Sequence, residues 1–512
     1  YDVTGELLYT ETKTEGSQLK IDRKFNYKNS NGLLESEEDG LGNKTFYKYD
    51  NYNRQNKIVY ASPANGTQES ANDYKQTFFT GAQVSSVRLR DGTHIYFGYD
   101  ELGRVNCKGL SADCSNVVET FVYDNFGRVR VHTNDTDGVD INTRYSEFEY
   151  NALGWKTSEK TGGSAASIIN EVAIGYNSYG QRSSFTWSDD FYVTYDYTVG
   201  SDVGALLQGI NENGSSTVPL ASFDYDAIGR RELLTRGLNT ATQYRYDGLN
   251  RLVNLATTFE NPSYNITESF AYNGVSQLKQ RSQQVYVNDY IYPHPDADLK
   301  TDYGTPNALN QYVSMSEGMY SVTMTNFNLI PRATYTYDDL GNMEHDGRGD
   351  YTYNLNNLLV SVDRGAYSAL YYDSENRLSK IVTEGETTTF IYDGLDLIAE
   401  TDGNGNITAR YVHGPNIDDP IVWYEGAGTT KKNYLVENYQ GSIVSVAREW
   451  GSGGNNVYIN AYDEYGIPAI TNYGRFQYTG QMWLGDDIGL YYYKARVYHP
   501  ELGRFLQTDP IG

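Results

Sequence analysis

Apolar and polar residues alternate in short stretches along the whole chain, and many of these stretches end in a tyrosine. Examples are Phe121-Val122-Tyr123, Phe223-Asp224-Tyr225 and Tyr335-Thr336-Tyr337. A period of two turns successive side chains toward opposite faces of a strand, so these stretches predict strands with one buried face. No run of about 18 apolar residues occurs in the sequence, so we expect no membrane insertion by a helix.

A turn signal follows these tyrosines. Tyrosine precedes Asp or Asn at fourteen aligned places, Gly or Asn stands four residues after it in twelve of them, and Arg stands five residues after it in six. Asp and Asn side chains accept hydrogen bonds from the backbone two residues on, and Gly or Asn tolerates the left-handed conformation that closes a loop. Each copy therefore predicts a β-hairpin. The tyrosines are Tyr1, Tyr49, Tyr99, Tyr123, Tyr150, Tyr176, Tyr225, Tyr246, Tyr272, Tyr337, Tyr353, Tyr372, Tyr392 and Tyr462.

Three copies illustrate the complete unit. Tyrosine ends the incoming strand, Asp starts the turn, Gly closes it, and Arg opens the returning strand. We interpret these residues as structural, with the ring and the guanidinium near enough across the turn for a cation–π contact. They are Tyr99, Asp100, Gly103 and Arg104; Tyr123, Asp124, Gly127 and Arg128; and Tyr225, Asp226, Gly229 and Arg230.

The spacing of the copies predicts the architecture. Many consecutive tyrosines are 19 to 27 residues apart, such as the 24 residues from Tyr99 to Tyr123. A lone hairpin is marginally stable in water, but each hairpin can add its strands to the edge of the one before. The predicted fold is all-β, with tandem hairpins in one continuous, twisted and spiralling sheet. The alternative is a β-propeller, in which four-stranded blades repeat about every 40–45 residues.

Two segments interrupt the spacing. Tyr272 and Tyr337 are 65 residues apart, and Tyr392 and Tyr462 are 70 residues apart. The first segment contains Tyr290–Asp296, whose two prolines predict an irregular insertion or a sheet edge. We expect longer loops in the second segment, and no helix in either.

The composition fits a fold made of hairpins. The 512 residues include 50 tyrosines and 50 glycines, and only 39% of the chain is hydrophobic, so tyrosine must supply much of the buried surface. The formal net charge of −25 disfavours nucleic acid and anionic membrane as partners. Solubility explains this charge most simply, and attraction of a cationic partner or cargo is the alternative.

The two cysteines predict a local disulfide. Six residues, including Gly109, separate Cys107 from Cys114 between two predicted strands. Such a short loop can bring the two Cα atoms within bonding range, and a disulfide fits an oxidising compartment. Two reduced thiols are the alternative. Two cysteines without a nearby histidine pair make a poor zinc site.

The repeat resembles the YD repeats of the Rhs family, which also occur in the shell-forming subunits of bacterial Tc toxin complexes and in teneurins. Tyr99–Arg104 is a full copy of that unit, and the resemblance spans essentially the whole chain. From Phe390 onward the sequence is similar to the Rhs-associated core, most specifically in Tyr411–Pro415 and Gly503–Gly512. The resemblance thus divides the chain into a repeat shell at 1–389 and a plug-like core region at 390–512.

The resemblance implies a hollow shell, or part of one, that holds a variable C-terminal effector after self-cleavage. Aspartates of the core are associated with that cleavage, and the matching residue is Asp509 in the closing Asp-Pro-Ile-Gly motif. The partner aspartate and the scissile bond follow this motif, so we expect an incomplete autoprotease in these 512 residues. Thr508 stands where Arg is common, and Asn438-Tyr439 where Asp-His is usual. The alternative for Asp509 is a turn that ends the last strand.

Other chemistry finds little support in the sequence. None of the six histidines forms a ligand pair at helical spacing, so no metal or other cofactor is expected. Adjacent acids such as Asp189-Asp190, Asp418-Asp419 and Asp486-Asp487 fit turns better than a glycosidase pair. Asp135–Asp140 and Asp402–Asn406 resemble calcium loops only in part, because neither has a full ligand set.

The sequence therefore supports a secreted or cell-surface shell that is not an enzyme. Its expected partner is its own C-terminal effector segment or components of a secretion system, with self-association through sheet edges as a further expectation. The alternative function is an extracellular adhesion or carbohydrate-binding protein, for which exposed aromatic side chains would supply platforms.

Overall fold

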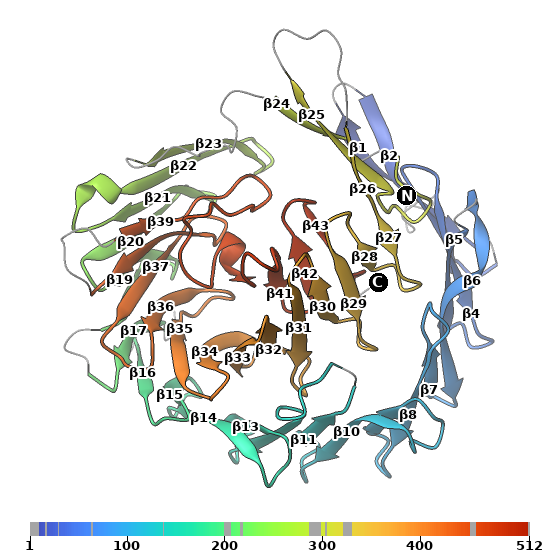
Figure 1. Cartoon of the computed structure of the whole chain (residues 1–512), viewed down its shortest axis with the longest axis horizontal. Coiled ribbons are helices and arrows are strands. Elements are labelled where there is room, and N and C mark those ends of the chain that lie inside the picture. The colour runs from blue at the N-terminus through green and yellow to red at the C-terminus, as the bar shows by residue number, and fades with distance from the viewer. Residues whose placement is uncertain are drawn as a thin grey trace. The chain divides into compact units, whose positions relative to one another are not determined.

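The computed structural model describes residues 10–15, 18–28, 30–62, 65–136, 138–198, 206–215, 219–285, 298–302, 305–320, 330–450 and 457–509. Two compact units make up the chain (Figure 1). Unit 1 contains Tyr1–Val122, Asp296–Thr352 and Gln507–Gly512, and unit 2 contains Tyr123–Pro295 and Tyr353–Leu506. The described residues contain no α-helix, and their helical elements are two 3₁₀ turns, Pro262–Tyr264 and Tyr478–Gly480.

Unit 1 is built from antiparallel strands that pair with their neighbours in the sequence. Two of them, β10 and β29, reach the boundary of the unit. The strands are β1 (Thr10–Glu15), β2 (Gln18–Tyr27), β3 (Leu34–Asp39), β4 (Lys44–Tyr49), β5 (Gln55–Ser62), β6 (Asn65–Thr80), β7 (Gln83–Arg88), β8 (His94–Tyr99), β9 (Val105–Gly109), β10 (Val117–Tyr123), β24 (Asp298–Asp302), β25 (Ser314–Tyr320), β26 (Ile330–Thr334), β27 (Thr336–Tyr337), β28 (Met343–His345) and β29 (Asp350–Tyr353).

Unit 2 contains a first sheet, β11–β23, in which each strand is antiparallel to the next. Because the pairing runs through these strands without a break, four-stranded propeller blades are excluded. The strands are β11 (Val129–Asn134), β12 (Tyr145–Tyr150), β13 (Lys156–Gly162), β14 (Ile168–Tyr176), β15 (Arg182–Thr186), β16 (Tyr192–Tyr197), β17 (Leu207–Glu212), β18 (Ala221–Tyr225), β19 (Arg231–Arg236), β20 (Thr240–Tyr246), β21 (Leu252–Thr258), β22 (Ile266–Tyr272) and β23 (Leu278–Val285).

A second sheet of unit 2, β30–β39, is followed by the short strands β40–β43. The start of the predicted core region, Phe390, lies within β33. The strands are β30 (Leu359–Asp363), β31 (Tyr367–Tyr372), β32 (Leu378–Thr383), β33 (Glu386–Asp393), β34 (Asp396–Asp402), β35 (Ile407–His413), β36 (Pro420–Glu425), β37 (Lys432–Glu437), β38 (Ile443–Arg448), β39 (Val457–Ile459), β40 (Met482–Trp483), β41 (Tyr491–Tyr493), β42 (Arg496–His499) and β43 (Arg504–Phe505).

The predicted hairpins are present. Strands end at Tyr99, Tyr123 and Tyr225, and the next strand starts six residues later in each case. In the turn after Tyr99, the Asp100 Oδ1 atom accepts the backbone N–H groups of Leu102 at 3.0 Å and Arg104 at 2.9 Å. Gly103 closes the turn with φ of +77°. The turn is therefore an Asx turn that is finished by a left-handed residue.

The first and last residues of the turn are chemically matched. Asp100 Oδ2 accepts the Arg104 Nε–H at 2.7 Å. In the turn at Asn177 the partner is an amide instead, and Asn177 Nδ2 donates to Gln181 Oε1 at 2.9 Å. In these two turns a carboxylate, which only accepts, is paired with a donor, and an amide is paired with an amide.

The repeat tyrosines join neighbouring hairpins. The Tyr99 hydroxyl donates to the backbone carbonyl of Val84 at 2.8 Å, and the Tyr246 hydroxyl donates to that of Arg231 at 3.1 Å. The strand register shifts at both tyrosines. A bulge at this point strengthens the local twist of the sheet, so the tyrosine both curves the strand and ties it to the hairpin before.

The cation–π contact differs from the expected one. We predicted that Tyr and Arg of one turn would meet, but the guanidinium lies over the tyrosine of the following repeat. Arg128 lies 4.4 Å from the Tyr150 ring centroid, and Arg230 lies 4.5 Å from that of Tyr246. The reason is that the arginine side chain is aligned by its own Asp along the edge of the sheet, toward the next hairpin.

The interrupted segments contain the same turn without the tyrosine. Asp402 Oδ1 accepts the N–H groups of Asn404 and Asn406, both at 2.9 Å, and Asn438 Oδ1 accepts those of Gln440 and Ser442. The turn at Asn307–Gln311 has the same bonds. The partial calcium-loop pattern at Asp402 is therefore one more repeat turn. The predicted irregular insertion at Tyr290–Asp296, and the first copy at Tyr1, lie outside the described residues.

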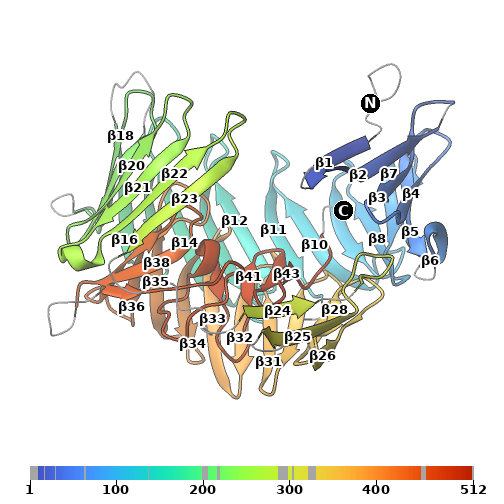
Figure 2. The same ribbon diagram turned by 90° about the horizontal axis from the view of Figure 1, so that it is seen from above.

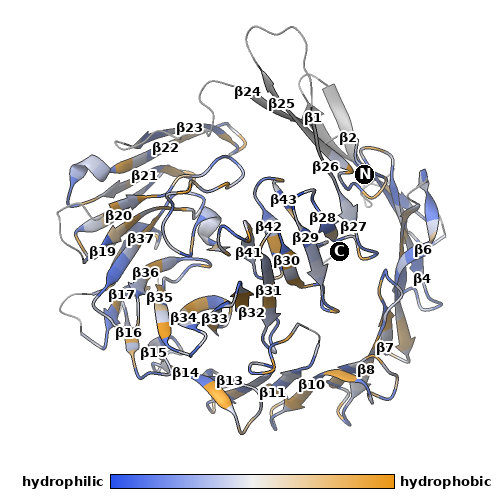
Figure 3. Cartoon of the chain, in the orientation of Figure 1, coloured by the Kyte–Doolittle hydropathy of each residue, from blue (hydrophilic) through white to orange (hydrophobic). Residues whose placement is uncertain are grey.

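The hydrophobic core of unit 2 lies between its two sheets. Phe185 of β15, and Trp187 and Phe191 of the connection that follows it, pack with Tyr424 from β36, and the Phe191 and Tyr424 rings are 5.4 Å apart. Figure 1 and Figure 2 show β34–β36 alongside β14–β16. Apolar residues are spread over the strands in short patches (Figure 3), as expected for strands with one buried face.

Candidate functional site

The candidate residue Asp509 lies at the end of the described chain, in unit 1. It is exposed and follows β43 after the buried Gln507. The preceding residue, Thr508, donates its backbone N–H to Asn342 Oδ1 at 3.1 Å, which fixes this end of the chain to a repeat turn. The rest of the motif, Pro510–Gly512, lies outside the described residues. The catalytic role of Asp509 stays a prediction.

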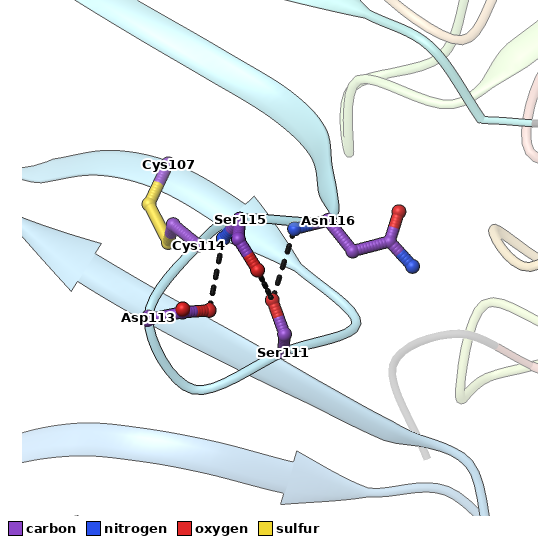
Figure 4. Close-up of a disulfide and its surroundings, with 6 residues drawn as sticks. All are labelled: Cys107, Ser111, Asp113, Cys114, Ser115 and Asn116. Carbon is purple, nitrogen blue, oxygen red and sulfur yellow. Dashed lines mark hydrogen bonds between the residues drawn. A yellow bond between two sulfur atoms is a disulfide. The ribbon is translucent and has the colours of Figure 1, made fainter.

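Cys107 and Cys114 are joined by a disulfide, with Cα atoms 6.6 Å apart. The bond connects β9 to the loop that leads into β10 (Figure 4). Within this loop Asp113 Oδ1 accepts the Ser115 N–H at 3.0 Å, and Ser111 Oγ accepts the Asn116 N–H at 2.9 Å. The disulfide therefore closes a loop that is already ordered by short-range hydrogen bonds.

Ion pairs connect the two sheets of unit 2. Arg377 is held by Asp373 of its own turn and by Glu159 of β13, both at 2.7 Å, and its side chain is only 6% exposed. Lys432 pairs with Glu212 at 2.7 Å, across the same interface. These contacts cannot be predicted from the sequence, because the partners are far apart in the chain and no local pattern relates them.

The pKa values of the acids at this interface are shifted in different directions, although burial acts to raise all of them. Burial raises the pKa of Asp373 even though Arg377 acts against it. Burial also acts to raise the pKa of Glu159, but Arg377 and Lys156 outweigh it and the pKa is lowered. Burial raises the pKa of Glu437 at the end of β37 to about 7, with Asp419 adding to the effect. Shifted carboxylates in an ion-pair network are expected for a packed interface and do not by themselves define catalysis.

Three of the adjacent acids predicted to lie in turns form ion pairs with cations of the chain itself. Asp189 pairs with Arg410, and Asp418 pairs with Lys494. Asp419 pairs with Arg231 at 3.1 Å. Within the described residues, no group of three or more His, Cys, Asp or Glu side chains could hold a metal ion. We therefore interpret the paired acids Asp189, Asp418 and Asp419 as structural.

Apolar side chains mark the tips of the hairpins in the first sheet of unit 2. The turns fall on alternate connections of an antiparallel sheet, so their tips share one edge. The residue three positions after each repeat tyrosine is apolar and 60–84% exposed. We call these residues the rim row; they are Phe126, Leu153, Tyr179, Ile228, Leu249 and Val275.

Comparisons with known proteins add distant relatives, although no family model matches the chain. The tRNA nuclease WapA of Bacillus subtilis (strain 168) is 26% identical over 330 residues, which cover 56% of this chain and 13% of WapA. The double-stranded DNA deaminase toxin A of Burkholderia cenocepacia (strain H111) is 24% identical over 326 residues, which cover 57% of this chain and 20% of that toxin. The chain thus spans a fifth or less of the length of these relatives.

A solved structure matches the chain almost completely. The crystal structure of TcdB2-TccC3 aligns with 98% of this chain and 30% of its own chain, with a TM-score of 0.72 and 14% sequence identity. The predicted all-β repeat fold is confirmed, with long antiparallel sheets. The fold is the one found in the Tc toxin shell of TccC3.

Proposed function

We propose that this chain is part of a shell that encloses a C-terminal effector polypeptide and takes part in its delivery. The observation that carries the proposal is the match of 98% of the chain to the TcdB2-TccC3 shell fold. The relatives add support, because a nuclease and a deaminase toxin share this region. Different activities are expected if one type of shell encloses different effector polypeptides.

In this proposal residues 1–512 are structural and have no enzymatic activity of their own. The acids of unit 2 are used in ion pairs such as Arg377–Glu159, which supports a role in holding the wall together. Asp509 would supply one carboxylate of a cleavage pair whose second member lies further along the polypeptide. A pair of this kind needs two close carboxyl groups with separated pKa values.

The test uses the native protein and Asp509. We expect intact-mass analysis to find a break after the Asp-Pro-Ile-Gly motif, with the downstream polypeptide retained and resistant to protease until the shell is unfolded. Asp509→Asn should leave the chain uncut, whereas Asp339→Asn, a matched change at an exposed turn residue, should not. An uncut native chain would argue against self-processing, and immediate digestion of the downstream polypeptide would argue against enclosure.

Secretion or display at the cell surface is the second part of the proposal. The Cys107–Cys114 disulfide supports it, because disulfides persist in oxidising surroundings. No helix of the described residues is both long and apolar enough to cross a membrane. Fractionation of the native source, followed by mass spectrometry for the oxidised Cys107–Cys114 peptide, tests the location. Finding the protein only in the cytosol with free thiols would refute it.

A second candidate function is adhesion or carbohydrate binding. It is favoured by the exposed rings at hairpin tips, since Phe126 and Tyr179 of the rim row are more than four-fifths exposed. Aromatic faces of this kind can pack against sugar rings. A glycan array with the native protein and a Tyr179→Ala variant tests it, and equal signals from both would exclude the rim row as the sugar site.

A further inference from the structure

A cavity of about 430 Å³ lies within unit 2, between the two sheets. Strands β15–β18 of the first sheet and β33–β35 of the second sheet supply its lining. Aromatic rings form much of the wall, among them Trp187, Tyr195, Tyr197, Tyr225 and Tyr411. Its size is within the usual range for sites that bind small organic molecules, roughly 300–1,000 Å³.

The cavity lies where a histidine replaces a repeat tyrosine. In the ordinary pattern the Tyr392 hydroxyl donates to the Leu378 carbonyl at 2.7 Å. His413 ends the next repeat strand, β35, and its Nε2–H donates to the Leu397 carbonyl at the same 2.7 Å. The strand register shifts at both residues. The imidazole therefore keeps the tyrosine's hydrogen bond but is smaller, which leaves space and a second ring nitrogen.

That second nitrogen is the unsatisfied polar atom of the cavity wall. The Tyr197 and Tyr225 hydroxyls already donate to the carbonyls of Arg182 and Leu207, at 2.9 and 2.7 Å. The His413 Nδ1 atom is buried and has no hydrogen-bond partner among the described residues, and the side chain is 8% exposed. Since Nε2 carries the proton that bonds Leu397, Nδ1 of the neutral ring is an acceptor.

A carboxylate faces this acceptor. Asp396 Oδ1 lies 3.9 Å from His413 Nδ1, too far for a direct hydrogen bond. Burial raises the pKa of Asp396, and the position of His413 partly offsets that effect. The other acid of the lining, Asp393, is paired with Arg182. One donor placed between the two acceptors could bond both, each at about 2.8 Å.

The surroundings favour a cation as that donor. Lys494 also acts on Asp396, but its Nζ atom is bound by Asp418 and by Gln481 Oε1 at 2.9 Å. Aromatic faces attract ammonium groups, and the cavity wall is rich in them. What the cavity offers an occupant is thus two acceptors, one unpaired negative charge and aromatic surface.

We propose that this cavity binds a primary ammonium group on an apolar stem, with the ammonium between His413 Nδ1 and the Asp396 carboxylate and the stem against the aromatic wall. A free alkylamine and a lysine side chain of a peptide share this chemistry. The proposal goes beyond the shell function and does not depend on it.

Isothermal titration calorimetry of the native protein tests the proposal, with n-butylammonium as the probe. We expect saturable binding, and affinity at least about tenfold weaker for n-butanol, which has the same stem without the charge. A lysine-containing peptide with an acetylated N-terminus and a free lysine side chain is the second probe. Tighter binding of this peptide than of butylammonium would assign the site to a lysine side chain, and tighter binding of butylammonium would assign it to a free amine. Absence of saturable amine binding, or equal binding of butanol, would overturn the proposal.

Two variants locate the binding. His413→Tyr restores the ordinary repeat, fills the cavity and should abolish amine binding while the thermal unfolding midpoint is kept. Asp396→Asn keeps the shape of the side chain but removes its charge, so it should weaken binding at least about tenfold. Asp402→Asn makes the same change in a turn outside the cavity and should bind like the unchanged protein. Binding that survives both cavity variants would overturn the assignment.

Discussion

The same five-residue turn occurs in two regions of the molecule with different consequences. In unit 1, Asp100 and Arg104 form the turn at the edge of a sheet, and the arginine side chain is 30% exposed. In unit 2, Asp373 and Arg377 form it with equal 2.7 Å contacts, but the arginine is buried and needs the additional acid Glu159. The local geometry is thus fixed by the repeat, whereas the energetics depend on what packs over it.

The contrast extends to the pKa of the two acids. Hydrogen bonds from Arg104 lower the pKa of Asp100. Burial raises the pKa of Asp373 despite the same kind of bonds. The same repeated motif therefore does not have a fixed chemistry, since solvent access decides whether its carboxylate is favoured in the charged form.

The largest expected difference is the loss of the arginine. Arg377→Ala leaves Asp373 buried without its cation and Glu159 paired only with Lys156, and we expect a loss of about 3–5 kcal/mol in the free energy of unfolding. Arg104→Ala breaks an exposed pair and should change stability far less. Urea unfolding of both variants measures the difference. Equal losses would contradict the distinction between buried and exposed turns.

The tyrosine hydroxyl gives the next largest effect. Tyr392→Phe removes a buried donor from the Leu378 carbonyl, which leaves that oxygen unsatisfied at a cost of about 1–3 kcal/mol. Tyr99→Phe removes the equivalent bond to Val84 at a half-buried position, where water can replace it, and should cost less. Thermal unfolding of the pair distinguishes the two, and a larger loss for Tyr99→Phe would be contrary to this account.

The residue three positions after the repeat tyrosine is packed in one region and exposed in another, so its replacement should have different effects on stability. Glu375 in the second sheet of unit 2 contacts His132 of β11 at 2.6 Å, so Glu375→Ala should cost about 1–3 kcal/mol. Phe126 occupies the same position in the rim row and is 81% exposed, so Phe126→Ser should stay within about 0.5 kcal/mol. Chemical unfolding compares the two. A large loss in the free energy of unfolding for Phe126→Ser would contradict this expectation, because it would mean that the hairpin tip with Phe126 is packed in solution.

The pH dependence should have opposite signs in the two regions. The pKa of Asp100 is lowered by folding, so its stabilising effect is present above its unfolded pKa and disappears as the pH falls through the folded value. The pKa of Glu437 is raised to about 7, so stability decreases as the pH rises from about 4.3 toward 7. Glu437→Gln should remove that decrease in stability. Asp100→Asn should lower the free energy of unfolding only above about pH 4, where the Asp100 carboxylate is charged in both states. Unfolding curves at pH 3, 5 and 8 measure both, and unchanged slopes would contradict the assignments.

Local sequence patterns predict the hairpins but not their packing. Tyr99, Asp100, Gly103 and Arg104 occupy their predicted places because Asx bonding and left-handed backbone are properties of a few adjacent residues. The pair Arg377–Glu159 could not be predicted, because it depends on which sheets face one another.

Two features of the fold cannot be recognised when the repeat is identified by its tyrosine. The turns at Asp402 and Asn438 lack the tyrosine, yet the spacing from Asp or Asn to a glycine three residues later, Gly405 and Gly441, would have revealed them. His413 in the tyrosine position carries no repeat signal in the sequence, and only its hydrogen bond to the Leu397 carbonyl relates it to the repeat tyrosines.

Enclosure of the effector polypeptide by the repeat sheet is the central claim of the proposed function. Cryo-electron microscopy of the native, full-length protein tests it directly. We predict a closed wall of YD-repeat hairpins with separate polypeptide density inside it, connected in sequence to the region after Gly512. A map in which these sheets form an open or filled particle, with the downstream polypeptide folded outside, would contradict the proposed shell.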